Sequence, residues 1–411
     1  MFRTHLLNCR VRSCQLGFAI ITSVVLILFA TTTGNAQTFT PLYEFQGGAD
    51  GEGPNGVISD FAGNLYGTTV AGGQTIYGTA FKLNSSGVKT ILYNFTGQTD
   101  GNAPHGLLVR DTKGNLYGTT QYGGDLNVQC FFTQGCGVVF KISPSGQETV
   151  LHSFSGGADG GQPLAGLTMD SVGNLYGTAA GGGDTSCSYY TFVGCGVVFK
   201  IDASGTFTVL YTFSGSDGAA PESHLTLDSS GSLYSSTTSG GAGGQGVIFK
   251  LDSSGHETVL LSFQGTYGSE PYGSLAIDAK GDLYGTTYGG GNLNDCSSGG
   301  CGIVFELKPD GQEPILNVFT DGPDGARPVG GLIRDKKGNL YGTAVVGGGL
   351  CSCGVTFQIT PAGVENVLYT FTGAADGDDP ETDLTEDAHG NLYGGALGGT
   401  YGSGVIYKIA P

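Results

Sequence analysis

Polar and charged side chains that could bind a ligand stand directly beside a series of regularly spaced prolines. These prolines are Pro54, Pro104, Pro163, Pro221, Pro271, Pro328 and Pro380. Their neighbours change from one copy to the next and supply the ligand-binding candidates, which are Asn55, His105, Glu222, Glu270, Tyr272, Arg327, Asp379 and Glu381. Converging carboxylates of this kind bind a cation or a polyol. They also occur as solvated loop tips on an acidic surface, and this alternative stays open.

Catalysis would need a more specific arrangement of these residues. Glu222 and Glu270 form the best available pair of carboxylates, and polysaccharide hydrolases and lyases use such a pair as acid and base. Of the histidines, only His105 and His224 are expected near the same place. The sequence has no HExxH, no GxSxG, no P-loop and no GxGxxG opening a helix. We therefore expect a non-catalytic protein that binds a glycan or a protein, with a polysaccharide-acting enzyme as the alternative.

A sequence repeat that occurs seven times, called the phrase below, must position these residues. Each copy runs from the proline through a short apolar segment, Asp, Gly-Asn-Leu-Tyr-Gly, a Gly-rich loop, Gly-Val-Val-Phe-Lys-Ile, a turn and Val-Leu-Tyr-x-Phe. The tyrosines of the Leu-Tyr pairs are Tyr66, Tyr117, Tyr176, Tyr234, Tyr284, Tyr341 and Tyr393. β-Branched and aromatic segments bounded by Gly, Ser and Asp predict four strands per copy, and repeats of this length indicate a propeller or a solenoid.

The last copy is split between the two ends of the chain. It stops after its third segment at Ile409, while Leu42–Phe45 matches the missing fourth segment. Such a split closes a ring and does nothing for an open rod. The sequence therefore predicts an all-β, seven-bladed β-propeller of four-stranded blades over residues 37–411. Residues 37–46 are expected to form the outer strand of the last blade.

The loops predict one functional face. Tight Asp-Gly turns join the first two strands, whereas the strand two-to-three loops and the loops between blades are long and emerge on the opposite face. Asp-Gly also precedes most of the prolines, at Asp50, Asp100, Asp159, Asp217, Asp324 and Asp376. A ring of carboxylates would suit Ca²⁺, but Asp followed by Gly is ordinary turn chemistry, which we favour. No other metal or cofactor is expected.

Eight cysteines lie in pairs within the strand two-to-three loops. The pairs are Cys130 with Cys136, Cys187 with Cys195, Cys296 with Cys301, and Cys351 with Cys353. Locally paired cysteines in an exported chain indicate disulfides, although the one-residue gap of the last pair suits the bond less well. Zinc would need two converging thiolate pairs, or pairs joined by His, and these loops contain no His.

The N-terminus carries the pattern of a secretory signal peptide. Arg3, Arg10 and Arg12 precede an apolar run over residues 16–30, and cleavage is expected after Ala36. A membrane anchor is the alternative, but the run is short for a span. Removing residues 1–36 takes away three Arg and no acid, which changes the formal charge from −18 to −21. We expect a secreted or periplasmic monomer that binds no nucleic acid and is not inserted in a membrane.

The phrase resembles that of the GloVer tandem-repeat proteins of bacteria, often described as choice-of-anchor proteins. The resemblance rests on Asp-x-x-Gly-Asn-Leu-Tyr-Gly-Thr-Thr, the Gly-Gly loop and Gly-Val-Val-Phe-Lys-Ile, and it covers residues 38–411. It implies an exported propeller-type protein and no agreed activity. The phrase is also similar to the Asp-x-x-Gly-x-Leu-Trp repeat of periplasmic sensor propellers, with Tyr in place of Trp.

Overall fold

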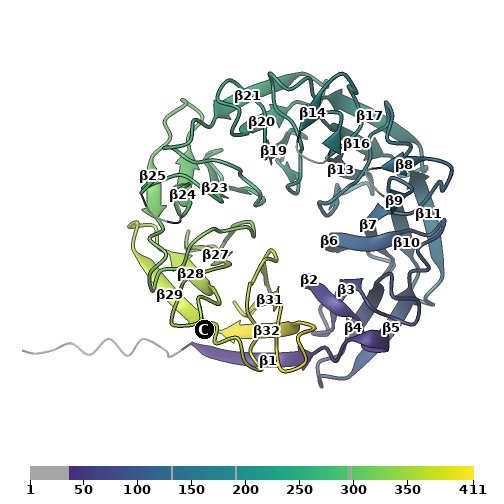
Figure 1. The fold of residues 1–411 in the computed structure, drawn as a ribbon, viewed down its shortest axis with the longest axis horizontal. Helices are drawn as coiled ribbons and strands as arrows, with labels where there is room; N and C mark the ends of the chain where they lie inside the picture. Colours follow the sequence, from purple (N-terminus) through teal and green to yellow (C-terminus); the bar gives the residue numbers. More distant parts are fainter. Residues whose placement is uncertain (1–36, 131–132, 190–191, 295, 297–298) are drawn as a thin grey trace, which may run out of the picture. The chain divides into compact units, whose positions relative to one another are not determined.

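The protein is a closed ring of seven four-stranded antiparallel sheets (Figure 1). The computed structural model describes residues 37–130, 133–189, 192–294, 296 and 299–411, and the ring is built from the unit Gln37–Pro411. The predicted signal peptide, residues 1–36, lies outside the described residues. No helix in the described ranges is both long and apolar enough to cross a membrane. The predicted fold class is confirmed.

The strands follow the four segments of the phrase. Blade 1 contains β2 (Glu52–Ser59), β3 (Leu65–Ala71), β4 (Thr79–Leu83) and β5 (Lys89–Asn94), and blade 2 contains β6 (Asn102–Arg110), β7 (Leu116–Tyr122), β10 (Val138–Ile142) and β11 (Glu148–Ser153). Blade 3 contains β12 (Thr168–Met169), β13 (Leu175–Ala179), β16 (Val197–Ile201) and β17 (Phe207–Thr212), and blade 4 contains β18 (Thr226–Leu227), β19 (Leu233–Thr237), β20 (Val247–Leu251) and β21 (Glu257–Ser262). Blade 5 contains β22 (Ala276–Ile277), β23 (Leu283–Thr287), β24 (Ile303–Leu307) and β25 (Ile315–Val318), and blade 6 contains β26 (Ile333–Arg334), β27 (Leu340–Ala344), β28 (Val355–Ile359) and β29 (Glu365–Thr370). Blade 7 contains β30 (Thr385–Glu386), β31 (Leu392–Ala396), β32 (Val405–Ala410) and β1 (Thr38–Glu44).

The two ends of the described chain share blade 7. Strand β1 pairs antiparallel with β32, from Thr38 opposite Ala410 to Glu44 opposite Val405. The ring of Phe39 on β1 stacks on Tyr369 of blade 6, with centroids 3.7 Å apart. The N-terminal strand therefore completes the last blade, as the split repeat predicted.

Aromatic pairs hold neighbouring blades together. The phenylalanine that ends the fourth segment of one blade meets the central aromatic of the third strand of the next blade edge to face. The pairs are Phe45–Phe81, Phe95–Phe140, Phe154–Phe199, Phe213–Phe249, Phe263–Phe305, Phe319–Phe357 and Phe371–Tyr407, with centroids 5.0–5.5 Å apart. These aromatic residues are at most 2% exposed. Edge-to-face pairs add about 0.5–1.5 kcal/mol each beyond their burial, so this contact, repeated seven times, forms the core of the ring.

The Asp, Asn and Tyr of the phrase form one hydrogen-bonded turn. In blade 2, Oδ1 of Asp111 accepts the backbone N–H groups of Lys113 and Asn115. Its Oδ2 accepts the Asn115 amide at 2.6 Å and the Tyr117 hydroxyl at 3.1 Å. Burial opposes ionisation of Asp111, but these hydrogen bonds outweigh it and lower the pKa of the carboxyl. The repeated carboxylates after the first strand are therefore structural.

The segment around each proline packs its blade against the preceding blade. In all seven blades, the residue before the proline has a positive φ between 42° and 64°. Its N–H donates to a carbonyl just before the third strand of the preceding blade, as in Gln162 to Cys136 (2.7 Å). The proline ring lies against the glycine that follows this carbonyl, and a Cβ on Gly137 would come within 2.7 Å of Pro163 Cδ. We call this arrangement the Gly–Pro latch. It recurs up to the closing contact of Gly404 with Pro54.

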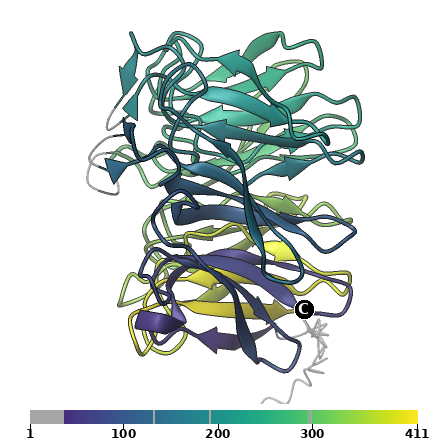
Figure 2. The ribbon, with the colours of Figure 1, turned by 90° about the vertical axis from the view of Figure 1, so that its right-hand side faces the viewer.

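The predicted cysteine pairs are bonded in the structure. The disulfides join Cys130 to Cys136, Cys187 to Cys195, Cys296 to Cys301, and Cys351 to Cys353. The carbonyl of the second cysteine in each pair is also the acceptor of a latch hydrogen bond. Two of the bridged loops carry short hairpins, β8 (Gln129–Cys130) with β9 (Thr133–Gln134) and β14 (Ser188–Tyr189) with β15 (Phe192–Val193). They project from the same side of the ring (Figure 2).

Candidate functional site

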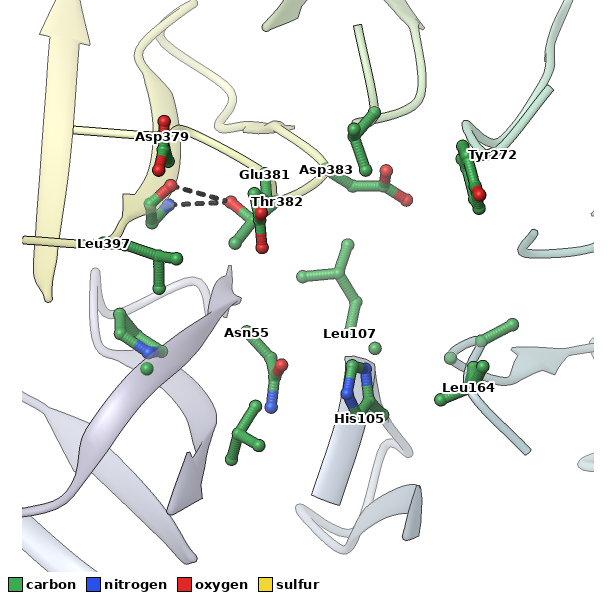
Figure 3. Close-up of a pocket in the computed structure, with 18 of the residues that line it drawn as sticks. Asn55, His105, Leu107, Leu164, Tyr272, Asp379, Glu381, Thr382, Asp383 and Leu397 are labelled. Atoms are coloured by element: carbon green, nitrogen blue, oxygen red, sulfur yellow. Dashed lines mark hydrogen bonds between the residues drawn. The ribbon is translucent and has the colours of Figure 1, made fainter. Parts of the chain in front are cut away.

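A cavity of about 620 Å³ lies at the centre of the ring. It is on the face that carries the long strand two-to-three loops and the loops between blades, which we call the long-loop face. The residue that follows the proline lines the cavity in every blade. These seven residues are Asn55, His105, Leu164, Glu222, Tyr272, Val329 and Glu381. They lie at the start of each blade's innermost segment, where the latch fixes the backbone and leaves the side chain toward the axis (Figure 3). A position that varies strongly between repeats therefore surrounds the cavity.

The structure brings together six of the eight predicted binding residues. Asn55, His105, Glu222, Tyr272, Asp379 and Glu381 line the cavity, whereas Glu270 and Arg327 do not. These two residues precede prolines and take the left-handed backbone of the latch, at φ 53° and 56°, as does Asp379, which does line the cavity. Arg327 instead donates to the Tyr288 hydroxyl at 3.2 Å, with its guanidinium 5.3 Å from the centre of that ring. Tyr288 in turn meets Tyr272 edge to face, so Arg327 supports the wall of the cavity from behind.

A second set of lining residues stands two positions further along the inner segments. It contains Leu107, Gly166, His224, Ser274 and Asp383. The Asp383 carboxylate accepts a hydrogen bond from Ser274 Oγ at 2.9 Å and another from the Gly331 N–H at 2.5 Å. Blade 6 has Gly331 at this level, and the absence of a side chain there lets blades 5 and 7 touch. The two-residue alternation of extended chain is the signal that could have selected Ser274, His224 and Asp383 together.

Glu222 is the most perturbed carboxyl of the cavity wall. Burial raises its pKa to about 7. The Thr238 hydroxyl, which donates to Oε1 at 3.0 Å, acts in the opposite direction, and the charge of Glu270 adds to the rise. Glu222 is therefore partly protonated at neutral pH and can both donate and accept hydrogen bonds.

The acidic residues of blade 7 face the cavity with like charges beside them. Burial raises the pKa of Asp379, and the neighbouring Asp378 carboxylate adds to the effect. Burial and the charge of Asp379 raise the pKa of Glu381 in the same way. In Figure 3, the side chains of Asp379, Glu381 and Asp383 come from one segment and lie across the cavity from Asn55 and His105.

The two histidines of the cavity are neutral near pH 7. Burial alone lowers the pKa of His105 to about 4. Burial also lowers the pKa of His224, although the Asp383 carboxylate and a hydrogen bond to the backbone of Leu167 favour its charged form. Neither imidazole therefore neutralises the carboxylates around it.

Asn55 has a structural part in the same wall. Its amide donates to the Thr68 hydroxyl at 3.0 Å and to the Pro104 carbonyl at 2.7 Å. The second bond joins blade 1 to blade 2. Both amide hydrogens therefore have partners, and among the described residues only the side-chain carbonyl oxygen of Asn55 has none.

Comparison with known proteins gives the family and the fold. The Gloeobacter/Verrucomicrobia repeat matches residues 27–192, 129–297 and 294–411. The chain belongs to the Gloeobacter/Verrucomicrobia repeat family. No curated protein matches its sequence at a significant level. The family agrees with the resemblance expected from the repeated phrase.

Solved structures share the fold of this repeat family at low identity. The extracellular domain of BT4673 from B. thetaiotaomicron, assigned to the hybrid two-component systems, superposes with a TM-score of 0.56 at 11% identity over 90% of this chain. The chain spans only 39% of the length of that domain. A protein assigned as a 6-phosphogluconolactonase from Bacteroides uniformis has a TM-score of 0.50 at 15% identity, covering 83% of this chain and 89% of its own. Sensor and lactonase-like propellers thus share one architecture, which fixes no activity.

The Asp-Gly carboxylates of this family member are engaged within their own turns. Asp100 accepts the Tyr93 hydroxyl at 2.9 Å, the Thr96 N–H at 2.8 Å and the Thr96 hydroxyl at 2.5 Å. Asp376 repeats the arrangement with Tyr369 and Thr372. Within the ranges that the structure covers, no three His, Cys, Asp or Glu side chains are grouped so as to hold a metal ion. The turn interpretation of these residues fits this geometry better than the Ca²⁺ alternative.

Proposed function

We propose that this protein is an exported binding protein that holds a sugar-like ligand in the cavity of its ring. The observation that carries the proposal is the composition of the wall. Leu107, Leu164, Val329 and Leu397 supply apolar surface, and Glu222, Tyr272, Asp379 and Glu381 supply hydrogen-bonding groups. A sugar ring has apolar C–H faces and a rim of hydroxyls, and a concave site with few polar groups on an apolar lining suits both.

Two further features support export and binding. Four disulfides lie in the loops of the long-loop face, and such bonds persist outside the cytosol. They brace the loops that surround the entrance, so the site is held in shape before the ligand arrives, which reduces the entropy lost on binding. Tyr267 and Tyr401 are exposed in the loops of this face and would extend the contact to a longer glycan or to a protein partner.

A glycan array tests the proposal. The wild-type protein should bind a defined set of glycans, and Glu222→Ala and Tyr272→Ala should each weaken that binding about tenfold or more, because each removes a wall group of the cavity. Phe61→Ala is the control, since Phe61 is an exposed aromatic residue in a tight turn of the opposite face and does not line the cavity. Unchanged binding in both wall variants would exclude the cavity as the site.

A second candidate function is suggested by the raised pKa of Glu222. A carboxyl that titrates near 7 in an enclosed site is suited to general acid catalysis, and a polysaccharide-acting hydrolase or lyase would use it. Glu270, the expected partner, does not line the cavity, so Asp379, Glu381 or Asp383 would have to act as the second carboxylate. Screening wild type and Glu222→Gln on plant and bacterial polysaccharides separates the two functions. Turnover in wild type that is lost in the variant would favour the enzyme.

A further inference from the structure

The ionisable residues that line the cavity are nearly all acidic. Its wall contains Glu52, Glu222, Asp379, Glu381 and Asp383, and it contains no Lys or Arg. The two histidines of the wall are neutral near pH 7 because burial lowers the pKa of each. The cavity wall therefore carries a net negative charge near pH 7.

The one cationic residue that the sequence placed among these acids lies outside the cavity. Arg327 is held against Tyr288 by its hydrogen bond and by the ring face. The outer edge of the ring shows the contrasting arrangement. There, Lys89 Nζ lies 2.8 Å from Asp50 Oδ1 and neutralises it.

Several groups of the cavity wall have no side-chain partner among the residues that the structure describes. In the described part of the chain, the carboxylates of Asp379 and Glu381 make no hydrogen bond and no ion pair with other side chains. The imidazole of His105, which lines the cavity and is half-buried, has no hydrogen-bond partner among these residues either. Asp383, by comparison, is satisfied by Ser274 and Gly331. Asp379 and His105 are half-buried and Glu381 is exposed in the cavity wall, so the polar groups of all three are accessible to a ligand there.

We propose that the ligand of this cavity carries a positive charge, and that its chemical class is an amino sugar or an oligomer of amino sugars. The inference rests on the proposed function and narrows it. An ammonium group beside Asp379 and Glu381 supplies the missing counter-charge and donates up to three hydrogen bonds. The sugar ring to which it is attached occupies the apolar part of the wall, and the neutral imidazole of His105 accepts or donates one hydrogen bond to a hydroxyl.

Two probes that differ in charge and in the N-acetyl group test the inference, and the salt dependence and the carboxylate variants below isolate the contribution of charge. Isothermal titration at pH 6 and low salt compares the glucosamine tetramer, which is cationic, with the N-acetylglucosamine tetramer, which is neutral. We expect the cationic tetramer to bind at least about tenfold more tightly, which is the effect of one charge-assisted contact. Its affinity should fall when salt is raised from 50 to 500 mM, while that of the neutral tetramer should hardly change.

Variants assign this difference to the wall. Asp379→Asn combined with Glu381→Gln should reduce the affinity for the cationic tetramer to that of the neutral one. Glu313→Gln is the control, because it removes a negative charge from an exposed position outside the cavity, and it should leave both affinities unchanged. Melting temperatures of all variants confirm that they are folded.

The outcomes separate the two proposals. Equal affinity for the two tetramers, or tighter binding of the neutral one, would overturn the inference and leave the proposed function intact. Failure of both tetramers to bind would overturn the amino-sugar class, and the glycan array would then decide whether the proposed function survives. A charge preference that persists in the double variant would overturn the assignment to Asp379 and Glu381.

Discussion

The proline of each blade takes part in the Gly–Pro latch, and the residue directly after it lines the cavity. The latch residues are constant between blades, whereas the residue after the proline varies. The first are the same in all seven blades, because a side chain on the glycine would collide with the proline of the next blade. The second varies from Asn55 through Leu164 to Glu381, because its side chain meets the open cavity. Packing removes freedom at the first position and leaves it at the second. Repeated residues in this chain therefore report structure, and function is expected where the copies differ.

The latch glycines should be the most sensitive positions in the ring. Gly246 has φ +95°, and a Cβ there would lie 2.2 Å from the Thr237 carbonyl oxygen and 2.8 Å from Pro271 Cδ. We expect Gly246→Ala to lower the free energy of unfolding by about 3 kcal/mol or more, through backbone strain plus a collision with rigid groups. Thermal or denaturant unfolding measures the change.

Gly244 provides the control for this experiment. It also has a positive φ, +70°, but a Cβ there meets no atom within 4 Å. Gly244→Ala should cost only about 1 kcal/mol, the strain of a left-handed alanine. Equal losses at Gly246 and Gly244 would contradict the latch and leave backbone conformation as the sole constraint.

The disulfides should reinforce the latch in the blades that carry them. The Cys136 carbonyl accepts the latch hydrogen bond of Gln162, so the bridge to Cys130 fixes the acceptor. We expect replacement of both cysteines by Ser to reduce stability by about 2–3 kcal/mol. Titration of free thiols in the unfolded, unreduced wild type is the accompanying check, and six or more reactive thiols would refute the disulfides themselves.

The first residue of the outer strand is a second position that varies between blades, and here the variation is expected to affect stability. Lys89 holds this place in blade 1 and pairs with Asp50, whereas Glu148, Glu257 and Glu365 hold it in blades 2, 4 and 6. Each of these glutamates has a buried oxygen without a hydrogen-bond partner among the described residues. Burial raises the pKa of each to about 7, and the charges of Asp100, Asp217 and Asp324 add to the effect. Three of the blade interfaces therefore place a glutamate beside an aspartate.

These contacts predict a pH-dependent effect of Glu148→Gln. A carboxyl with a raised folded-state pKa binds more protons in the folded protein, so its contribution to stability is fully present below about pH 4.5 and is lost as the pH rises through about 7. The variant should therefore match wild type near pH 4. At pH 8 it should be more stable by about 1 kcal/mol, a value reduced to allow for the partial exposure of Glu148 to solvent.

Calorimetry at both pH values measures this difference. Comparing the variant with wild type cancels the opposing contribution of His105, whose lowered pKa makes the folded state lose stability in acid. Lys89→Gln is the contrasting variant and should destabilise the protein at pH 8, because it leaves Asp50 without its counter-charge. A pH-independent effect of Glu148→Gln would show that the two carboxylates do not interact.

The smallest effects on stability are expected in the cavity wall. Val329→Thr and Glu381→Gln change side chains that face open space, and each should alter the free energy of unfolding by no more than about 0.5 kcal/mol. Unfolding curves of the two variants should overlay that of wild type. A loss as large as that of Gly244→Ala would contradict the separation between latch and cavity.

From the sequence, the candidate site could be placed beside the prolines, but the contacts among its side chains could not be predicted. The positions of the prolines indicated where a ligand site would lie, and six of the eight binding residues predicted from the sequence line the cavity. Arg327 and Glu270 lie outside the lining, and the latch backbone alone does not decide this, because Asp379 also precedes a proline at positive φ and lines the cavity. For Arg327 the deciding contact is with Tyr288, which lies 39 residues away in the sequence. Ser274 did not stand out, and its hydrogen bond with Asp383 could not be predicted, because this contact crosses two blades and exists only where Gly331 leaves a gap.

The sequence by itself determined the number of blades, the strands, the turn chemistry of Asp111 and its equivalents, the cysteine pairing and the closure of the ring by residues 38–44. These features depend on local hydrogen bonds, on periodic patterns and on repetition, all of which are written along one chain. Only the tertiary structure decided which charges meet. Lys89 reaches Asp50, Arg327 leaves the acids of the cavity, and Asp379 and Glu381 remain without a counter-charge in the described protein. Such pairings depend on distances between blades, which no spacing in the sequence encodes.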